Sequence, residues 1–206
     1  DCRIFQEKTV LEIIEAVFGD YGGADFQVKC SESYKPREYC VQYRETDLEF
    51  VSRLMEEEGI FYFFEHSGSA HTMVLADDSS AISPCAQDRA RFSISPGGWR
   101  DEDVITDLEK EKAVHSTAVI LNDYDPLQPA LNLQSSAVKE PEDEIYDYPG
   151  KFSKTRDGER YSSLRLEELS TLEEVLRGGG DCRAFESGRK FTLADYYRQD
   201  ANDDYL

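Results

Sequence analysis

The 206-residue sequence predicts an α+β fold. Residues 1–78 alternate between helical and strand patterns, and both helices there begin with the same Thr-x-x-Glu signal. Residues 79–206 contain several short strand-like runs and a single long helical pattern. We therefore expect an α/β unit with two capped helices over residues 1–78, and a strand-rich unit with one long helix over residues 79–206.

The most regular pattern lies in residues 37–77, where a strand, a helix and two further strands follow one another with short connections. Residues 38–43 are rich in Tyr, Val and Cys, as β-strands are. Thr46 and Glu49 have the spacing of a capping box, in which each side chain accepts a hydrogen bond from the other residue's backbone N–H. Gly59 is the expected end of this helix, since glycine readily adopts the left-handed conformation found there.

The helix that follows Thr46 is expected to bury one apolar face. That face consists of Leu48, Val51, Leu54 and Met55. The run from Ile60 to Phe64 is apolar throughout and predicts a buried strand. A turn at residues 67–69 then leads to a returning strand from His71 to Ala76.

An earlier helix has the same signals. Thr9 and Glu12 have capping-box spacing, and Gly19 is the expected end. Residues 26–30 alternate between apolar and polar side chains, which predicts a half-buried strand. The chain begins with Asp1 rather than Met and opens almost directly on this helix, so we expect it to be part of a longer protein. The apolar stripe of the helix is Val10, Ile13, Ile14, Val17 and Phe18.

The second half of the chain has weaker patterns. Asp157 is the expected N-cap of a helix over residues 158–176, and the glycine triplet at residues 178–180 is its expected end. Gly188 predicts a bulge in the last strand. Short strands are expected at residues 91–95, 104–108, 114–124, 130–138, 144–150 and 185–193, with a turn at residues 95–98 and a charged bend at residues 109–112.

The charge balance is strongly acidic, with 43 Asp and Glu against 23 Lys and Arg and a net charge of −20. Such a charge argues against nucleic acid and against anionic membrane surfaces as partners, because both would repel it. It favours a solvated acidic surface or a basic partner. No run of 18 apolar residues occurs in the sequence, so no membrane-spanning helix is predicted.

Five cysteines occur at irregular spacing, namely Cys2, Cys30, Cys40, Cys85 and Cys182. None belongs to a C-x-x-C pair, so neither a zinc ribbon nor a thioredoxin-type motif is predicted. Reduced thiols are the simplest interpretation for a protein that folds in the cytosol, and a bridge between Cys30 and Cys40 is the alternative.

Signals for catalysis are scarce. The sequence has no G-x-S-x-G elbow, P-loop or H-E-x-x-H motif. Among the three histidines, His66 and His71 flank a turn and are expected to approach each other, but no further ligand follows at a recognisable metal-site spacing. We therefore predict no catalytic, cofactor-binding or metal-ligating residues. The acidic run at residues 56–58 lies at a helix C-terminus, where it needs an Arg or Lys partner.

Large aromatic side chains are numerous, with 12 Tyr and 11 Phe. Tyrosine is favoured where one end of the side chain is buried and the other is wet, as at protein interfaces. Tyr146 and Tyr148 are expected on one face of a strand, where they serve either core packing or a subunit interface. If such faces lie between subunits, an Asp at Tyr146 or at Phe191 in the last strand is expected to weaken assembly.

Several long stretches together resemble VgrG proteins, the spike proteins of type VI secretion, which look like the hub protein of contractile phage tails fused to a needle. The resemblance is carried by REYCVQYRETDLEFVSRLMEEEGIFYFF and HTMVLADD, by CRIFQEKTVLEIIEAVF at the start, by LNDYDP and EIYDYPG in the middle, and by GERYSSLRLEEL near the end. These matches keep their order and span nearly the whole chain.

The resemblance implies a phage tail hub-like fold made of β-barrel-type domains with α/β embellishments. It also implies a homotrimer that adapts a hexameric tube to a trimeric needle, takes part in virulence, and has no catalytic residues of its own. The implied partners are further copies of the chain, the tube-forming hexameric protein, baseplate proteins, and spike-tip and effector proteins. Assembly in the bacterial cytoplasm and secretion through the type VI apparatus would follow.

Two alternatives remain at the level of the sequence. One is the tail hub of a contractile phage or phage-like particle, with a lytic domain elsewhere in the parent chain. The other is a monomeric acidic adaptor for effectors or chaperones. A lysozyme-like insertion in the full-length gene distinguishes the first alternative, and the oligomeric state distinguishes the second.

Overall fold

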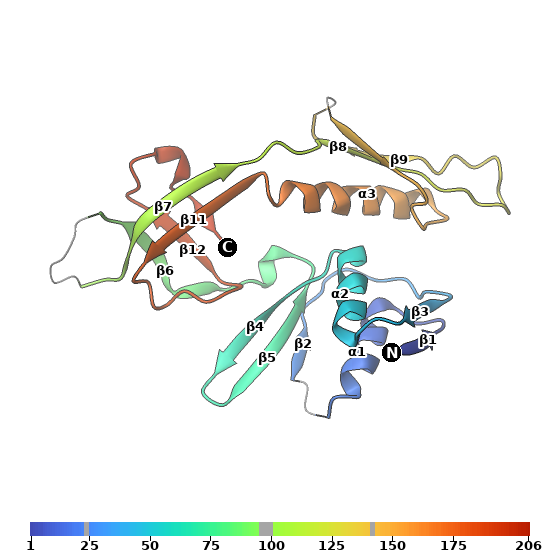
Figure 1. Cartoon of the computed structure of the whole chain (residues 1–206), viewed down its shortest axis with the longest axis horizontal. Helices are drawn as coiled ribbons and strands as arrows, with labels where there is room; N and C mark the ends of the chain where they lie inside the picture. The colour runs from blue at the N-terminus through green and yellow to red at the C-terminus, as the bar shows by residue number, and fades with distance from the viewer. Residues whose placement is uncertain (23–24, 95–100, 141–142) are drawn as a thin grey trace. The chain divides into compact units, whose positions relative to one another are not determined.

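The computed structural model describes residues 1–22, 25–94, 101–140 and 143–206. These residues form two compact units, one of residues 1–105 and 181–206 and the other of residues 106–180 (Figure 1). The described residues form mixed sheets and three α-helices, which confirms the predicted α+β class. The domain division at residue 78 stays a prediction, and the expected turn at residues 95–98 lies outside the described residues.

The first unit holds two helices and most of the strands. Its elements are β1 (Cys2–Phe5), α1 (Val10–Gly19), β2 (Phe26–Val28), β3 (Cys40–Tyr43), α2 (Asp47–Glu58), β4 (Phe61–Ser67), β5 (Ala70–Ala76), β6 (Pro84–Phe92), β12 (Lys190–Ala194) and β13 (Asp204–Tyr205), with short 3-10 turns at Ser79–Ala81 and Gln199–Ala201. Strand β7 (Val104–Lys112) begins in this unit and continues into the second.

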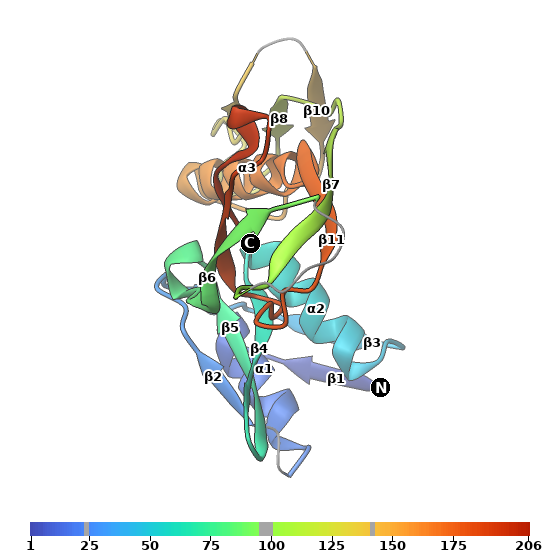
Figure 2. The same ribbon diagram turned by 90° about the vertical axis from the view of Figure 1, so that its left-hand side faces the viewer.

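The second unit holds the remaining helix and four further strands. Its elements besides β7 are β8 (Ala118–Leu121), β9 (Ser135–Val138), β10 (Glu144–Asp147), α3 (Thr155–Ser170) and β11 (Glu174–Gly180) (Figure 2). β8 is the central strand of a three-stranded sheet, parallel to β10 and antiparallel to β9. Each group of paired strands among the described residues keeps two edges, so barrel-type closure stays a prediction.

Both predicted capping boxes are present. Glu12 accepts the backbone N–H of Thr9 at 2.8 Å, and Thr9 Oγ1 accepts the backbone N–H of Glu12 at 3.3 Å. Thr46 and Glu49 make the same pair of hydrogen bonds, at 2.8 and 3.2 Å. Gly59 has a φ of 71°, which confirms the left-handed end predicted for α2.

The core of the first unit lies between α1 and α2. Phe50 is fully buried there, whereas Leu48 is 62 % exposed, so the prediction that Leu48 belongs to the buried face of α2 is wrong. The buried stripe instead follows positions i, i+1, i+4, i+5 and i+8 from Phe50, and Leu48 lies just outside it in the first turn. The buried cluster comprises Val10, Ile13, Ile14, Val17, Cys40, Phe50, Val51, Leu54, Met55, Ile60 and Leu75.

A three-stranded sheet of β2, β5 and β4 packs on both of its faces. β5 is the central strand, parallel to β2 and antiparallel to β4. Leu75 joins the helical core, while Val74 on the opposite face joins a second cluster with Phe63 and Ile82. The prediction that residues 60–64 form a fully buried strand is wrong, because β4 lies at the sheet edge and exposes every second side chain.

Strand β1 was not predicted, since the chain was expected to open on a helix. β1 pairs with β3 in an antiparallel ribbon in which Cys2 lies opposite Tyr43 and Phe5 lies opposite Cys40. The pairing joins segments about forty residues apart, so neither segment alone shows it. It closes the end of the helical core, where the Phe5 and Phe50 rings stack at 5.7 Å.

The C-terminal strands return to the first unit. β12 pairs in parallel with β6 and antiparallel with β13, and its pairing with β6 shifts register after Lys190. β6 begins at Pro84, seven residues before the strand predicted at residue 91, because its first part pairs with the distant strand β12, where Lys190 lies opposite Pro84. The left-handed residue Gly188, with a φ of 74°, precedes β12 rather than forming a bulge inside it.

The charged residues 109–112 form part of β7, so the predicted bend there is wrong. Their charges are matched by β11, the neighbouring strand in the sheet. Lys110 forms an ion pair with Glu174, and Lys112 forms a second one with the same carboxylate at 2.9 Å. Glu111 forms an ion pair with Arg177 at 3.2 Å. Opposite charges on adjacent strands stabilise their pairing. They allow residues 109–112 to continue the strand although Glu and Lys are uncommon in β-strands.

Helix α3 packs against β8 and β9, which places its apolar residues over Val119, Leu121 and Leu133. It spans Thr155–Ser170 with Lys154 at the N-cap position, so the prediction of a 158–176 helix capped by Asp157 is wrong at both ends. Thr171 Oγ1 donates to the carbonyl of Glu167 at 3.1 Å at the end of α3. The glycine triplet lies in β11 instead.

Gly158 in α3 provides a test of this packing. Gly158→Ala is expected to lower the free energy of unfolding by about 1–3 kcal/mol, since an added Cβ would lie 2.5 and 2.6 Å from atoms of the Phe152 ring and also against Ser135 Oγ. In an open helical position the same change stabilises by about 0.5–1 kcal/mol.

The matched control is Gly19→Ala at the end of α1, where an added Cβ meets nothing within 4 Å. Denaturant unfolding of both variants measures the two effects. Equal stability changes in the two variants would show that α3 does not pack as described.

Candidate interaction surfaces

The acidic end of α2 has the basic partner that the sequence required. Arg37 contacts Glu57 at 2.7 Å through one guanidinium nitrogen and Glu58 at 2.8 Å through the other. Glu58 is buried, with 7 % of its side chain exposed. Burial opposes the charge of Arg37, but its hydrogen bonds to both glutamates outweigh that effect and raise its pKa.

A polar network fixes the β1–β3 ribbon to both helices. Arg3 Nε donates to Gln42 Oε1 at 2.7 Å, and Gln42 Nε2 donates to Asp47 Oδ1 at 2.7 Å. Arg3 also contacts Asp47 directly and Asp20 at 2.6 Å, at the start of α2 and the end of α1. Hydrogen bonds from Gln42 and then from Tyr21 hold the pKa of Asp47 below its usual value.

The outer face of the same ribbon is apolar and exposed. Ile4 lies directly opposite Val41, and Cys2 lies opposite Tyr43. All four side chains are exposed. The two-residue alternation of these side chains with Arg3 and Gln42 was the available sequence signal, and it was missed because β1 was missed. An exposed apolar sheet face of this kind is typical of a protein-contact surface.

Asp77 joins the end of β5 to the loop at residues 31–34. Its carboxylate accepts the backbone N–H groups of Ser31 and Glu32, each at 2.8 Å, and the Tyr34 hydroxyl at 2.8 Å. Burial alone would raise the pKa of Asp77, but these hydrogen bonds outweigh it and hold the pKa below its usual value. The carboxylate therefore holds this loop against the sheet.

In the second unit, two tyrosines predicted to share a strand face are both on the surface. Tyr146 in β10 is 56 % exposed and Tyr148 just after it is 55 % exposed. The Tyr146 hydroxyl accepts a hydrogen bond from Asn122 Nδ2 at 3.3 Å. This placement favours the interface interpretation over core packing for both side chains.

Phe191 is placed differently from the tyrosines. It is partly buried in β12, with the Phe185 ring centroid at 4.4 Å and that of Tyr205 at 6.0 Å. An Asp at this position would therefore disturb packing inside the chain before it disturbed any assembly. Tyr146 is the sharper probe of an interface.

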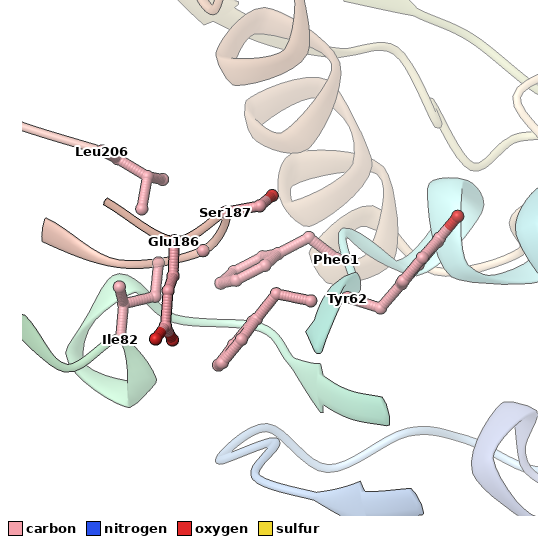
Figure 3. A pocket seen from close by; sticks show the side chains of 8 residues that line it. Phe61, Tyr62, Ile82, Glu186, Ser187 and Leu206 are labelled. Atoms are coloured by element: carbon pink, nitrogen blue, oxygen red, sulfur yellow. The ribbon is translucent and has the colours of Figure 1, made fainter. Parts of the chain in front are cut away.

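A pocket of about 360 Å³ opens in the first unit (Figure 3). Phe61 and Ile82 give it apolar walls, and Gly188 brings its backbone against the Phe63 side chain. The lining residues with titratable side chains are Glu186 and Tyr62. The residues around the pocket are Phe61, Tyr62, Phe63, Ile82, Glu186, Ser187, Gly188 and Leu206.

The histidines fall into two settings. His66 and His71 approach each other as predicted, with 2.7 Å between their Nδ1 atoms. His115 lies in the second unit, where its Nε2 contacts Glu173 at 3.3 Å. Within the described residues, no group of three or more His, Cys, Asp or Glu side chains is arranged for a metal ion. All five cysteines lie in the described ranges as free thiols, Cys30 and Cys40 included.

In the part of the chain that the structure describes, no helix combines the length and the apolar character that crossing a membrane requires.

The family model of the phage tail baseplate hub (GPD) matches residues 1–206, and the chain belongs to this family. Within it, the chain is similar to the type VI secretion system spike proteins VgrG1c and VgrG1b of Pseudomonas aeruginosa. They are 40 % and 41 % identical to it over 100 % of this chain and 29 % of each relative. VgrG3 of Vibrio cholerae is 30 % identical over 99 % of this chain and 21 % of its own length.

These relatives confirm the resemblance to VgrG proteins. The chain spans less than a third of the length of these curated relatives. Its surfaces therefore belong to a module that, in those proteins, accompanies other regions.

Two solved structures share the fold. A component of the type VI secretion system of E. coli, described as structurally similar to the bacteriophage T4 tail proteins gp27 and gp5, matches with a TM-score of 0.68 at 19 % identity, over 100 % of this chain and 44 % of that chain. A 43 kDa prophage tail protein from Shewanella oneidensis matches with a TM-score of 0.69 at 10 % identity, over 98 % of this chain and 61 % of that chain. Both support the predicted phage tail hub-like fold.

Proposed function

We infer that this chain is the hub part of a type VI secretion spike. Three copies form a ring that adapts the hexameric tube to the trimeric needle, and contraction of the apparatus drives the spike into a target cell. The observation that carries this proposal is the similarity to spike proteins over the whole chain at 40 % and 41 % identity. The shared fold with a type VI component is consistent with it.

The role of the chain in this proposal is mechanical rather than enzymatic. The relatives are named as spike and hub proteins, and the pocket of the first unit offers one carboxylate and one phenol without a histidine or a thiol beside them. Catalysis would need a positioned nucleophile or a matched acid and base. Any enzymatic activity of the parent protein is thus assigned to regions beyond this module.

The proposed partners follow from the same assignment. They are two further copies of the chain, the tube-forming hexameric protein, baseplate proteins, and spike-tip and effector proteins that the spike delivers. Assembly would take place in the bacterial cytoplasm before secretion through the type VI apparatus. The net charge of −20 disfavours nucleic acid as a partner and favours basic protein surfaces.

The second candidate function is that of a tail hub in a contractile phage or phage-like particle. It is favoured by the match to a prophage tail protein over 98 % of this chain. The full-length gene distinguishes the two candidates, since a lysozyme-like domain between hub and needle would support the phage-type hub.

An exposed tyrosine tests the proposed trimer. Tyr146→Asp is expected to raise the dissociation constant of the trimer by about tenfold or more, because truncating or charging an aromatic hot spot at an interface costs about 2 kcal/mol or more. Concentration-dependent sedimentation measures the change, and unfolding by denaturant shows that the subunit itself is intact.

Tyr197→Asp is the matched control, since Tyr197 is also exposed but belongs to the first unit and lies outside the β1–β3 ribbon. If Tyr146→Asp and Tyr197→Asp assembled equally well, the β10 face would not lie between subunits.

A further inference from the structure

Strands β4 and β5 form a hairpin (Figure 1). Two histidines face each other across it. His66 on β4 lies directly opposite His71 on β5, with four residues between them in the sequence. Both side chains are exposed. Their Nδ1 atoms are 2.7 Å apart, and their ring centroids are 4.9 Å apart at an interplanar angle of 71°. One ring therefore donates its N–H to the lone pair of the other.

The strands hold the two rings in place. Residues opposite each other in an antiparallel pair project to the same face, so both imidazoles rise from one side of the hairpin. The Phe64 ring, two residues before His66 on the same strand face, lies parallel to it with an interplanar angle of 12° and a centroid distance of 6.4 Å. The approach of the two nitrogens is thus set by the sheet.

We propose that His66 and His71 form a bidentate site for a divalent transition-metal ion with right-angled coordination, of the nickel and copper class. Imidazole nitrogen is a preferred ligand of these ions, and the ion would replace the shared proton. Two ligands at right angles with bonds of about 2.1 Å lie about 3.0 Å apart, whereas a tetrahedral arrangement separates them by about 3.4 Å. The observed 2.7 Å is closer to the first geometry.

Among the described residues, no further protein ligand competes with water for the remaining coordination positions. Glu65, next to His66, contacts Lys29 at 3.1 Å and Arg189 at 3.9 Å, and its side chain leaves the strand on the opposite face from His66. No third His, Cys, Asp or Glu joins the pair among the described residues. The site is therefore open, and the net charge of −20 raises the local concentration of cations around it.

Nickel alone is the probe for the test, because Cu²⁺ oxidises free thiols and the chain has five cysteines without disulfide partners. Calorimetric titration of the chain with Ni²⁺ is expected to give one ion per chain. His66→Gln and His71→Gln are each expected to weaken binding by about tenfold or more, since the second ligand acts at high effective concentration. His115→Gln, in the other unit, is the control and should bind as the parent does.

Proton NMR of the imidazole ring signals provides the second measurement. Ni²⁺ at a substoichiometric amount should broaden the signals of His66 and His71 together and leave those of His115 sharp. Broadening of one of the pair alone would contradict a shared ion, and so would unchanged nickel affinity in either Gln variant. Both outcomes are independent of trimer formation, so this site can fail while the hub assignment stands.

Discussion

Arg37→Ala should be among the most destabilising single changes in the chain, with an expected loss of about 3 kcal/mol in the free energy of unfolding. The variant leaves Glu58, whose side chain is 7 % exposed, without the guanidinium that lies 2.8 Å away. Breaking a buried ion pair by removing one partner typically costs about 3–5 kcal/mol, and the low end applies because Arg37 keeps 22 % of its side chain exposed. Urea unfolding of both proteins measures the difference.

Arg53→Ala is the matched control. Arg53 also joins two glutamates, Glu45 at 2.8 Å and Glu57 at 3.6 Å, but its side chain is more exposed, and such pairs contribute about 0–1 kcal/mol. A second variant that combines Arg37→Ala with Glu58→Gln should regain part of the loss, since it removes the buried charge that the Arg37 guanidinium compensates. If the two arginine variants lost equal stability, burial of the Arg37 pair would not be its source.

Asp77→Asn is expected to cost about 2–4 kcal/mol. The amide has nearly the same shape as the carboxylate, but it loses the charge that strengthens the hydrogen bonds from the backbone N–H groups of Ser31 and Glu32 and from the Tyr34 hydroxyl. The amide also has one acceptor oxygen where the carboxylate has two. Its NH₂ group then faces an N–H or O–H donor and cannot accept a hydrogen bond from it. Thermal and denaturant unfolding measure the loss.

The effect of Asp77 depends on pH in a defined direction. Its pKa in the folded chain lies below the value of about 3.9 for an unperturbed Asp. The stability it contributes is therefore fully present above about pH 4 and is lost as the pH falls through the folded-state pKa. The difference in unfolding free energy between the parent chain and Asp77→Asn should shrink below about pH 4 accordingly.

Asp25→Asn is the control for Asp77, because the Asp25 carboxylate lies in an exposed setting with a hydrogen bond from Thr72 Oγ1 at 2.7 Å. It should cost under about 1 kcal/mol. A stability difference between Asp77→Asn and the parent chain that stays constant from pH 7 to pH 2 would contradict the described hydrogen bonds.

The elements predicted best are those whose signals are local. Both helices of the first unit were located by their Thr and Glu caps, and these caps act within four residues of sequence. Gly59 was predictable for the same reason, since its left-handed φ is a local property. The core side chains of α2 were harder to predict. Leu48 and Phe50 are both large and apolar, and only the packing of α2 against the rest of the unit decides which of them is buried.

The elements that were missed depend on partners far away in the sequence. β1 forms only because β3 pairs with it, and β7 continues through its charged residues only because β11 supplies opposite charges. Helix α3 was predicted to start three residues late because Asp157 suggested a cap, whereas the N-cap residue is Lys154, which makes no side-chain capping hydrogen bond. Local propensity is overridden in each case by tertiary contacts.

The candidate surfaces were predicted in part. The sequence required a basic partner for residues 56–58, but it did not identify Arg37, which reaches them from a connection twenty residues earlier. The approach of His66 and His71 followed from their places on either side of a turn. The apolar outer face of the β1–β3 ribbon could not be predicted without β1 itself.

The proposed hub role relates the ion pairs, the hydrogen-bonded loop and the exposed surfaces to one another. In the proposed ring, a subunit would have to keep its shape while neighbouring proteins bind it. The Arg37–Glu58 ion pair and the hydrogen bonds of Asp77 hold two connections of the first unit in place. The exposed face of the β1–β3 ribbon and the exposed side chains of Tyr146 and Tyr148 are the candidate contact surfaces for that assembly.

The absolute mass of the chain in solution, measured by light scattering together with that of the full-length gene product, tests the central claim most directly. One chain has a mass of 23.5 kDa. The hub proposal predicts three times that mass for this chain and a trimer for the full-length product. A monomeric full-length product would contradict the proposal and favour an acidic adaptor instead.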